Sequence, residues 1–262
     1  YNGSMLRSTP CTQAQLESDT FQQWAITLRE RPLHLHRKIW EWCFIAQALE
    51  ERGMLQPGRR GLGFAVGQEP LAALFAARGC AIVATDLATA EAEAGGWVIT
   101  GQHAAAVQAL NQRGLCPEAR FAQHVTFRFA DMRALPSDLG DYDFVWSACA
   151  LEHLGSLRAG LDFIETSLAL LKPGGVAVHT TEYNLSSNIF TRRRGDAVIY
   201  RRRDLTALAD RLRRQGYAID LTFDAGDGPA DQAVDRPPYK HDPHLKLQLG
   251  RYVATSYGLI IE

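Results

Sequence analysis

Apolar residues recur along the first fifty positions with the spacing of amphipathic helices. Phe21, Trp24 and Leu28 fall on one helical face, and the pattern resumes at Trp40 after a break at Pro32. A proline and a glycine at positions 57 and 58 end this pattern. We therefore predict an N-terminal helical segment over residues 1–57, whose first four residues precede the first methionine and have the look of a tag remnant.

Short apolar runs alternate with helical patterns from residue 58 onward. The runs predict seven strands, at residues 61–66, 81–85, 125–129, 142–147, 176–180, 218–223 and 252–261. Helical spacing falls between most of them, around residues 71–75, 107–110, 161–171 and 205–212. Strand and helix in alternation predict an α/β, doubly wound, Rossmann-like domain over residues 58–262, with a mostly parallel sheet and helices on both faces. Segments 87–124 and 184–203 are long for plain connections and are interpreted as insertions.

Composition limits the function classes. Hydrophobic residues make up 46% and charged residues 22%, which is typical of a globular protein, and the formal net charge of −1 gives no general attraction to nucleic acid or to an anionic membrane. The five cysteines contain no CxxC pair, which favours a reducing cytoplasm over a disulfide framework or a thiolate zinc site. No run reaches the roughly 18 apolar residues of a membrane span. A homo-oligomer is compatible with the sequence.

The residues that follow the first strands carry the candidate chemistry. In an open α/β sheet a ligand binds outside the carboxyl ends of the strands, near the switch in strand order. Gly67, after the first strand, lets the backbone approach a ligand closely. Asp86 ends the second strand, where its carboxylate can accept hydrogen bonds from both ribose hydroxyls of an adenosine. After the third strand, Asp131 can accept from an adenine amino group and Met132 can cover the ring.

These turns, taken in order, resemble the motifs of class I S-adenosylmethionine-dependent methyltransferases over roughly residues 58–262. Two further stretches extend the resemblance, Leu151-Glu152-His153-Leu154 and the most telling one, Leu171-Lys172-Pro173-Gly174-Gly175. The resemblance implies S-adenosyl-L-methionine as the cofactor, held across the tips of strands one to three, with the methyl acceptor over strands four and five. It also implies that the last strand of the sheet runs antiparallel.

The first motif departs from the family pattern. Gly63 stands where an acidic residue is usual, and Ala65 and Glu69 each replace a glycine. Our hypothesis is that Glu69, at a helix start, supplies the missing negative charge toward the ammonium or sulfonium of the cofactor. An ordinary acid stabilised by the helix dipole is the alternative.

Histidines and a carboxylate follow the fourth and fifth strands. A hydroxyl acceptor needs its proton removed, and histidine titrates nearest to neutral pH. We predict His179 as the base, with Glu182 orienting it or replacing it, and His153 as the further candidate. Tyr183 and Asn184 continue the same stretch as predicted hydrogen-bonding partners of the acceptor.

The segment after the fifth strand carries Arg192, Arg193 and Arg194, which are interpreted either as a solvated face or as a binding site for phosphate or carboxylate on the acceptor. No metal is expected, because Cys149 takes the first position of the Glu-x-x-Glu-His motif through which some family members bind one. His34 with His36, and His241 with His244, could each be half of a metal site, but no third ligand at a suitable spacing is visible, so surface histidines are favoured.

The sequence thus predicts an O-methyltransferase acting on a sugar hydroxyl or another small polar acceptor, in polysaccharide or related biosynthesis. An N-methyltransferase of a small amine and a non-catalytic S-adenosylmethionine-binding protein remain the alternatives. A dinucleotide-dependent oxidoreductase is disfavoured, because the first turn lacks the second and third glycines that a pyrophosphate requires.

Overall fold

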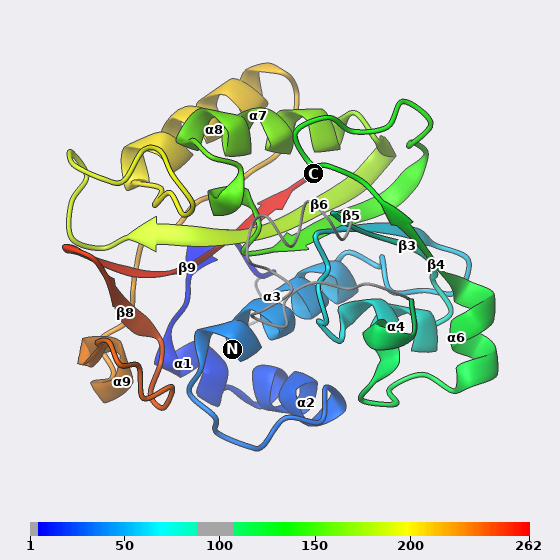
Figure 1. Cartoon of the computed structure of the whole chain (residues 1–262), viewed down its shortest axis with the longest axis horizontal. Coiled ribbons are helices and arrows are strands. Elements are labelled where there is room, and N and C mark those ends of the chain that lie inside the picture. Colours follow the sequence, from blue (N-terminus) through cyan, green and yellow to red (C-terminus); the bar gives the residue numbers. More distant parts are fainter. Residues whose placement is uncertain (1–4, 88–106) are drawn as a thin grey trace.

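The computed structural model describes residues 5–87 and 107–262. The predicted tag remnant, and residues 88–106 of the first predicted insertion, lie outside the described residues. The described part forms nine strands in a single sheet with helices on both faces (Figure 1). The strands are β1 (Thr9–Pro10), β2 (Arg60–Phe64), β3 (Ala81–Asp86), β4 (Val125–Phe129), β5 (Tyr142–Ala148), β6 (Leu171–Asn184), β7 (Val234–Asp235), β8 (Lys246–Leu249) and β9 (Tyr252–Ile261).

The helices fall into an N-terminal group and a group between the strands. They are α1 (Gln13–Glu17), α2 (Asp19–Thr27), α3 (Arg37–Glu51), α4 (Leu71–Ala77), α6 (Glu118–His124), α7 (Leu157–Leu168), α8 (Arg202–Arg214) and α9 (Pro229–Gln232), with two 3-10 helices, η1 (Val107–Asn111) and η2 (Leu151–His153). None of the described helices is both long and apolar enough to span a membrane.

The strand order is β4-β3-β2-β5-β6-β9-β8-β7, and β1 also pairs with β9. The strands from β4 to β6 are parallel to their neighbours, whereas β9 is antiparallel to β6. The chain winds outward from β2 to β4 and then in the other direction through β5 and β6, which places the switch point between β2 and β5. This topology confirms the predicted doubly wound α/β class, and a ligand crevice is expected at the carboxyl ends of these two strands.

Each face of the sheet has its own core. Side chains alternate along β6: Val176 and Val178 pack in the core under α3 and α4, and Ala177 packs in the core under α7 and α8. The N-terminal helix α3 packs directly on β9, because Gly258 leaves room for the ring of Phe44. A Cβ at Gly258 would lie 2.2 Å from that ring. In Figure 1 α3 accordingly lies against the face opposite to α7 and α8.

The prediction of a strand at residues 218–223 is wrong. The edge of β9 next to that segment is taken by β1, which pairs with Tyr257 and Gly258. The segment keeps an isolated bridge between Leu221 and Ser8 and a pair of backbone hydrogen bonds between Ala218 and Glu262. The N-terminal residues therefore supply the main-chain partners that the segment would otherwise use. Residues 107–111 form a 3-10 helix, and the helical pattern at 161–171 ends earlier because Leu171 already belongs to β6.

Candidate functional site

The Asp86 carboxylate joins the turns that follow β2 and β3. It accepts hydrogen bonds from the backbone N–H groups of Gly67 at 3.1 Å and Leu87 at 2.9 Å. The carbonyl of Asp86 accepts from the N–H of Ala130 at 2.8 Å, which brings the end of β4 alongside. Three of the turns predicted to hold the cofactor are therefore adjacent at the carboxyl ends of β2, β3 and β4.

The turn after β2 is tight, and two of its residues have left-handed backbones. Ala65 has a φ of 46° and Gly67 a φ of 51°, a region that glycine enters freely and alanine does not. Within β2, a Cβ on Gly63 would lie 2.4 Å from the indole of Trp146. The acidic residue that the family pattern expects at position 63 therefore has no room here, because Trp146 of β5 fills that space.

Glu69 follows this turn and is buried. Its Oε1 accepts a hydrogen bond of 2.9 Å from the indole N–H of Trp146. Burial raises the pKa of Glu69 to about 8, although the hydrogen bond from Trp146 acts in the opposite direction. Trp146 thus excludes an acidic side chain from position 63 and also binds the carboxyl group of Glu69.

Asp131 and Met132 lie beside the cofactor turns but have other partners. Arg133 donates to the Asp131 carboxylate from its backbone N–H at 2.8 Å and from its guanidinium, and these hydrogen bonds lower the pKa of Asp131. Met132 is buried in the core under α7 and α8. The predicted contacts of Asp131 and Met132 with the adenine of the cofactor stay predictions.

A cluster of buried polar side chains lies at the carboxyl ends of β5 and β6. Its members come from α3, from the segment after β5, from the end of β6 and from β9, and we call it the polar cluster: Arg37, Lys38, Glu41, Cys149, Glu152, Glu182 and Ser256. Glu182 is 4% exposed and forms an ion pair with Arg37 through Oε1. Its Oε2 is buried and has no hydrogen-bond partner among the described residues. The cluster therefore contains one free carboxylate oxygen.

The cations of the polar cluster come from the first turn of α3. Lys38 pairs with Glu41 at 2.6 Å, and the same carboxylate accepts from Ser256 at 2.6 Å and from the Cys149 thiol at 3.1 Å. Sequence reasoning missed Arg37, Lys38 and Glu41. Their signal was the charge at three positions of the first half of α3, next to the apolar run 42–46.

Within the polar cluster, the pKa values of Glu41 and Glu182 are shifted in opposite directions. For Glu41, Lys38 and Arg37 outweigh the effect of burial and lower the pKa to about 2. For Glu182, burial together with the nearby Glu152 and Glu41 outweighs Arg37 and raises the pKa to about 7. Glu182 is thus the member of this pair that exchanges a proton near neutral pH.

Cys149, Glu152 and Glu182 could also hold a cation, since one potential ligand atom of each lies within 4.8 Å of the others. Each is already engaged, however. The Cys149 thiol donates to Glu41, Glu152 accepts from Thr181 at 3.0 Å, and Glu182 pairs with Arg37. A metal ion here would compete with the Arg37 guanidinium for the same carboxylate.

His179 lies on the other face of β6, and the geometry contradicts its predicted role as a base. Its side chain is fully buried, with Nδ1 2.8 Å from the hydroxyl of Ser147 and Nε2 3.2 Å from that of Ser167. Burial lowers the pKa of His179 to about 3. An imidazole on the α7 side of the sheet with both nitrogens engaged by serine hydroxyls has no nitrogen left for the proton of an acceptor.

The other predicted acceptor-side residues organise the segment between β6 and α8. His153 Nδ1 contacts the carbonyl of Asp196 at 2.6 Å. The Asn184 side chain accepts from the N–H of Ser186 at 2.9 Å and donates to the carbonyl of Phe190 at 3.1 Å. Tyr183 packs in the core under α7 and α8, 5.2 Å from the ring of Tyr257. The structure therefore gives Tyr183 and Asn184 structural contacts in place of the predicted acceptor contacts.

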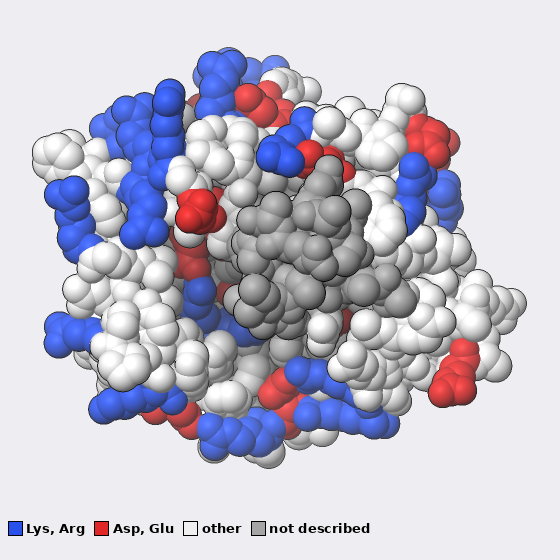
Figure 2. All heavy atoms as spheres, in the orientation of Figure 1, with Lys and Arg blue, Asp and Glu red and all other residues white. Residues whose placement is uncertain are grey.

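Arg192, Arg193 and Arg194 are exposed, and within the described residues their guanidinium groups have no hydrogen bond or ion pair. Figure 2 shows Lys and Arg side chains gathered over the part of this face where Figure 1 places α8 and the segment before it. By contrast, Arg201 is buried and pairs with Asp204 at 2.7 Å at the start of α8. The three exposed arginines are thus available to an anion.

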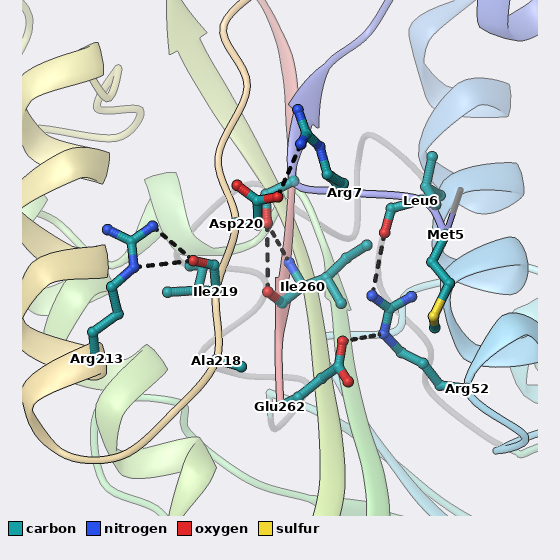
Figure 3. Close-up of a pocket in the computed structure, with 11 residues that line it drawn as sticks. Met5, Leu6, Arg7, Arg52, Arg213, Ala218, Ile219, Asp220, Ile260 and Glu262 are labelled. Carbon is teal, nitrogen blue, oxygen red and sulfur yellow. Dashed lines mark hydrogen bonds and ion pairs between the residues drawn. The ribbon is translucent and has the colours of Figure 1, made fainter. Parts of the chain in front are cut away.

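A cavity of about 550 Å³ opens at the opposite end of the sheet (Figure 3). Arg7 pairs there with Asp220 at 3.1 Å, and Arg52 pairs with Glu262 at 2.7 Å. None of the predicted site residues lines this cavity. The third arginine of the lining, Arg213, pairs with Asp210 and donates to the carbonyl of Ile219, so the charged groups of the cavity already have partners.

No protein-family model matches the sequence, and no curated protein matches it significantly. Among solved structures, the chain resembles magnesium protoporphyrin IX methyltransferase from Synechocystis with bound SAH (14% identity, 95% of this chain and 96% of that one, TM-score 0.49). It also resembles DhpI in complex with SAH (14% identity, 95% and 94%, TM-score 0.48). A putative sarcosine dimethylglycine methyltransferase from Galdieria sulphuraria is 21% identical (TM-score 0.41) over 56% of this chain, which spans 46% of the length of that protein. Resemblances at this level do not by themselves assign an activity.

Proposed function

We propose that the protein is an S-adenosyl-L-methionine-dependent O-methyltransferase that acts on a sugar hydroxyl or another small polar alcohol, in polysaccharide or related biosynthesis. The observation that carries the proposal is the position of two sites at one edge of the sheet. Asp86 and the tight turn at Gly67 lie at the carboxyl ends of β2 and β3, and the polar cluster with the free Oε2 of Glu182 lies at the ends of β5 and β6. In doubly wound folds this edge is where ligands bind.

The residues at β2 and β3 suit a cofactor that combines an adenosine with a positive charge. Asp86 offers a carboxylate to the ribose hydroxyls, and Gly67 permits a close approach of the backbone. The hypothesis that Glu69 supplies a substitute negative charge requires the cofactor's cation to favour the ionised form, because burial alone raises the pKa of Glu69 to about 8. The bound cofactor would supply an electrophilic methyl group, and the chain's own residues position the acceptor and take its proton.

Glu182 replaces His179 as the proposed base. In this role Oε2 of Glu182 takes the proton of the acceptor hydroxyl, and the bound cofactor would supply the methyl group that the hydroxyl oxygen receives. A carboxylate with a pKa near 7 is suited to this step at neutral pH. Arg37 holds the other carboxylate oxygen, and His153 supports the segment above through Asp196.

An N-methyltransferase of a small amine is the second candidate, because the same free oxygen of Glu182 could bind an ammonium group. The exposed Arg192, Arg193 and Arg194 favour an acceptor that carries phosphate or carboxylate. A cytoplasmic location and a homo-oligomeric state remain predictions from the sequence.

A methyl-transfer screen with labelled S-adenosylmethionine tests the proposal. The panel should contain neutral sugars, sugar phosphates and uronic acids, each matched with an amino sugar of the same ring. We expect label on a hydroxyl, with acidic sugars preferred over neutral ones. Label confined to the amino sugars would favour the second candidate. Binding of the cofactor without transfer to any acceptor would favour a non-catalytic protein.

A further inference from the structure

Four histidines that are far apart in the sequence meet beside the start of α3. His34 and His36 precede α3, and His241 and His244 lie in the loop between β7 and β8. His36 and His244 form an isolated β-bridge, in which the N–H of Arg37 donates to the carbonyl of His244 at 3.1 Å. The fold therefore supplies a third potential ligand that the spacing in the sequence did not show, and His244 is only 5% exposed.

Three of these rings lie close together, and the ring of His36 is stacked on those of His244 and His241. The ring centroids of His36 and His244 are 4.7 Å apart, those of His241 and His244 are 4.9 Å apart, and those of His36 and His241 are 5.9 Å apart. One ligand nitrogen of each lies within 4.8 Å of the other two. Around a tetrahedral zinc with bonds of about 2.1 Å, such nitrogens are about 3.4 Å apart. Binding therefore requires the three to close by about an ångström.

Asp235 provides the outer support that metal-binding histidines usually have. Its carboxylate lies 2.6 Å from Nδ1 of His244 and also accepts from the N–H groups of Lys240 and His241. Donation from Nδ1 to a carboxylate leaves the lone pair of His244 on Nε2, the atom available for a metal.

The remaining two ligands differ in how readily they are available. His241 is exposed, and within the described residues its ring has no hydrogen-bond partner. His36 is partly buried, and its Nδ1 accepts from the N–H of Lys38 at 3.1 Å as the N-cap of α3. To bind through Nε2, His36 must carry its proton on Nδ1 and give up this cap. We therefore expect His36 to be the weakest of the three ligands.

We propose that His36, His241 and His244 form a binding site for one divalent transition metal ion of the zinc type, oriented by Asp235. Imidazole nitrogen is a preferred ligand of zinc and its first-row neighbours, and three histidines leave a fourth position open. The ion would tie the loop before β8 to the start of α3, one residue from the Arg37 that pairs with Glu182. The site does not depend on the proposed methyl transfer.

Titration of the chelator-treated full chain with Zn²⁺, by competition with a chromophoric chelator, tests the site. We expect one equivalent to bind with a Kd of about 1 µM or tighter. X-ray absorption of the zinc-loaded chain should show only nitrogen or oxygen neighbours at about 2.0–2.1 Å. A sulfur neighbour at about 2.3 Å would place the ion at a cysteine such as Cys149 and overturn the assignment.

Three variants and one matched control locate the ligands. His241→Ala changes an exposed side chain, and His36→Asn keeps a good N-cap, so both should fold and bind zinc at least about tenfold more weakly. Asp235→Asn should cost about 10- to 100-fold. His34→Asn, the control, should bind within about threefold of the unmodified chain. A Kd weaker than about 100 µM in the unmodified chain, or equal affinity in His241→Ala, would contradict the proposal.

Discussion

Glu182 and His179 are three residues apart in β6, and the pleat of the strand gives them opposite environments. Glu182 faces α3 and the other members of the polar cluster, with one oxygen free. His179 faces α7 and is enclosed between two serine hydroxyls. From the sequence alone, the proximity of histidine to neutral pH favoured His179. The sequence could not predict which face of β6 lies toward the acceptor, because apolar residues occupy both faces of a buried parallel strand.

The assignment of the base to Glu182, with a structural role for His179, is directly testable. Glu182→Gln should lower kcat by at least about a hundredfold while cofactor affinity stays within about threefold, because a glutamine cannot take the acceptor's proton. His179→Asn should mainly lower the melting temperature, since it disturbs the contacts with Ser147 and Ser167. Steady-state kinetics of both variants, with melting curves, decide the matter. Normal kcat in Glu182→Gln together with a loss in a well-folded His179→Asn would restore the histidine as the base.

The pH profile provides an independent readout of the same residue. A base acts in its deprotonated form, so with a pKa near 7 for Glu182 the rate should fall as the pH drops below about 7 and level off above it. The charged groups that face this carboxylate are Arg37 and Glu41 of α3 and Glu152 after β5.

At the scale of elements, the segment between β6 and α8 carries the arginines that we assign to the acceptor. Asn184 and His153 contact its backbone on either side of the three arginines, at Phe190 and Asp196, so the exposed guanidinium groups project from a supported loop. The sequence predicted an insertion at residues 184–203 and showed that it is rich in arginine. It could not show that Asn184 supports the loop, since an asparagine after a strand equally suits a binding role.

Replacing Arg192, Arg193 and Arg194 together with alanine should raise the KM for an anionic acceptor while cofactor affinity stays unchanged. The reason is that guanidinium groups pair with phosphate or carboxylate and lie away from Asp86. Kinetics with an acidic acceptor and its neutral analogue measure the effect, and only the acidic one should be affected. Arg158→Ala, an exposed arginine in α7, provides the control. An unchanged KM would leave the three arginines as a solvated face.

Over the whole molecule, the pattern of apolar runs located the five parallel strands β2 to β6, because each contains a short run rich in apolar residues next to a turn. The bounds of β4 agree at both ends, and β3 differs by one residue. The error at 218–223 arose from a contact that no local pattern encodes, the pairing of β1 with β9. The polar cluster and the histidine site were missed for the same reason, since both join α3 to strands or loops more than a hundred residues away.

The cofactor assignment at the switch point is the central claim, and calorimetric titration of the full chain with S-adenosylmethionine tests it most directly. We predict binding at one site, weakened in Asp86→Ala by about 2 kcal/mol, because hydrogen bonds that involve a charged partner are typically worth about 1.5 to 3 kcal/mol. Melting curves of the variant confirm that the turn at Gly67 still folds. Absence of binding to the unmodified chain, or equal affinity in a folded Asp86→Ala variant, would contradict the account.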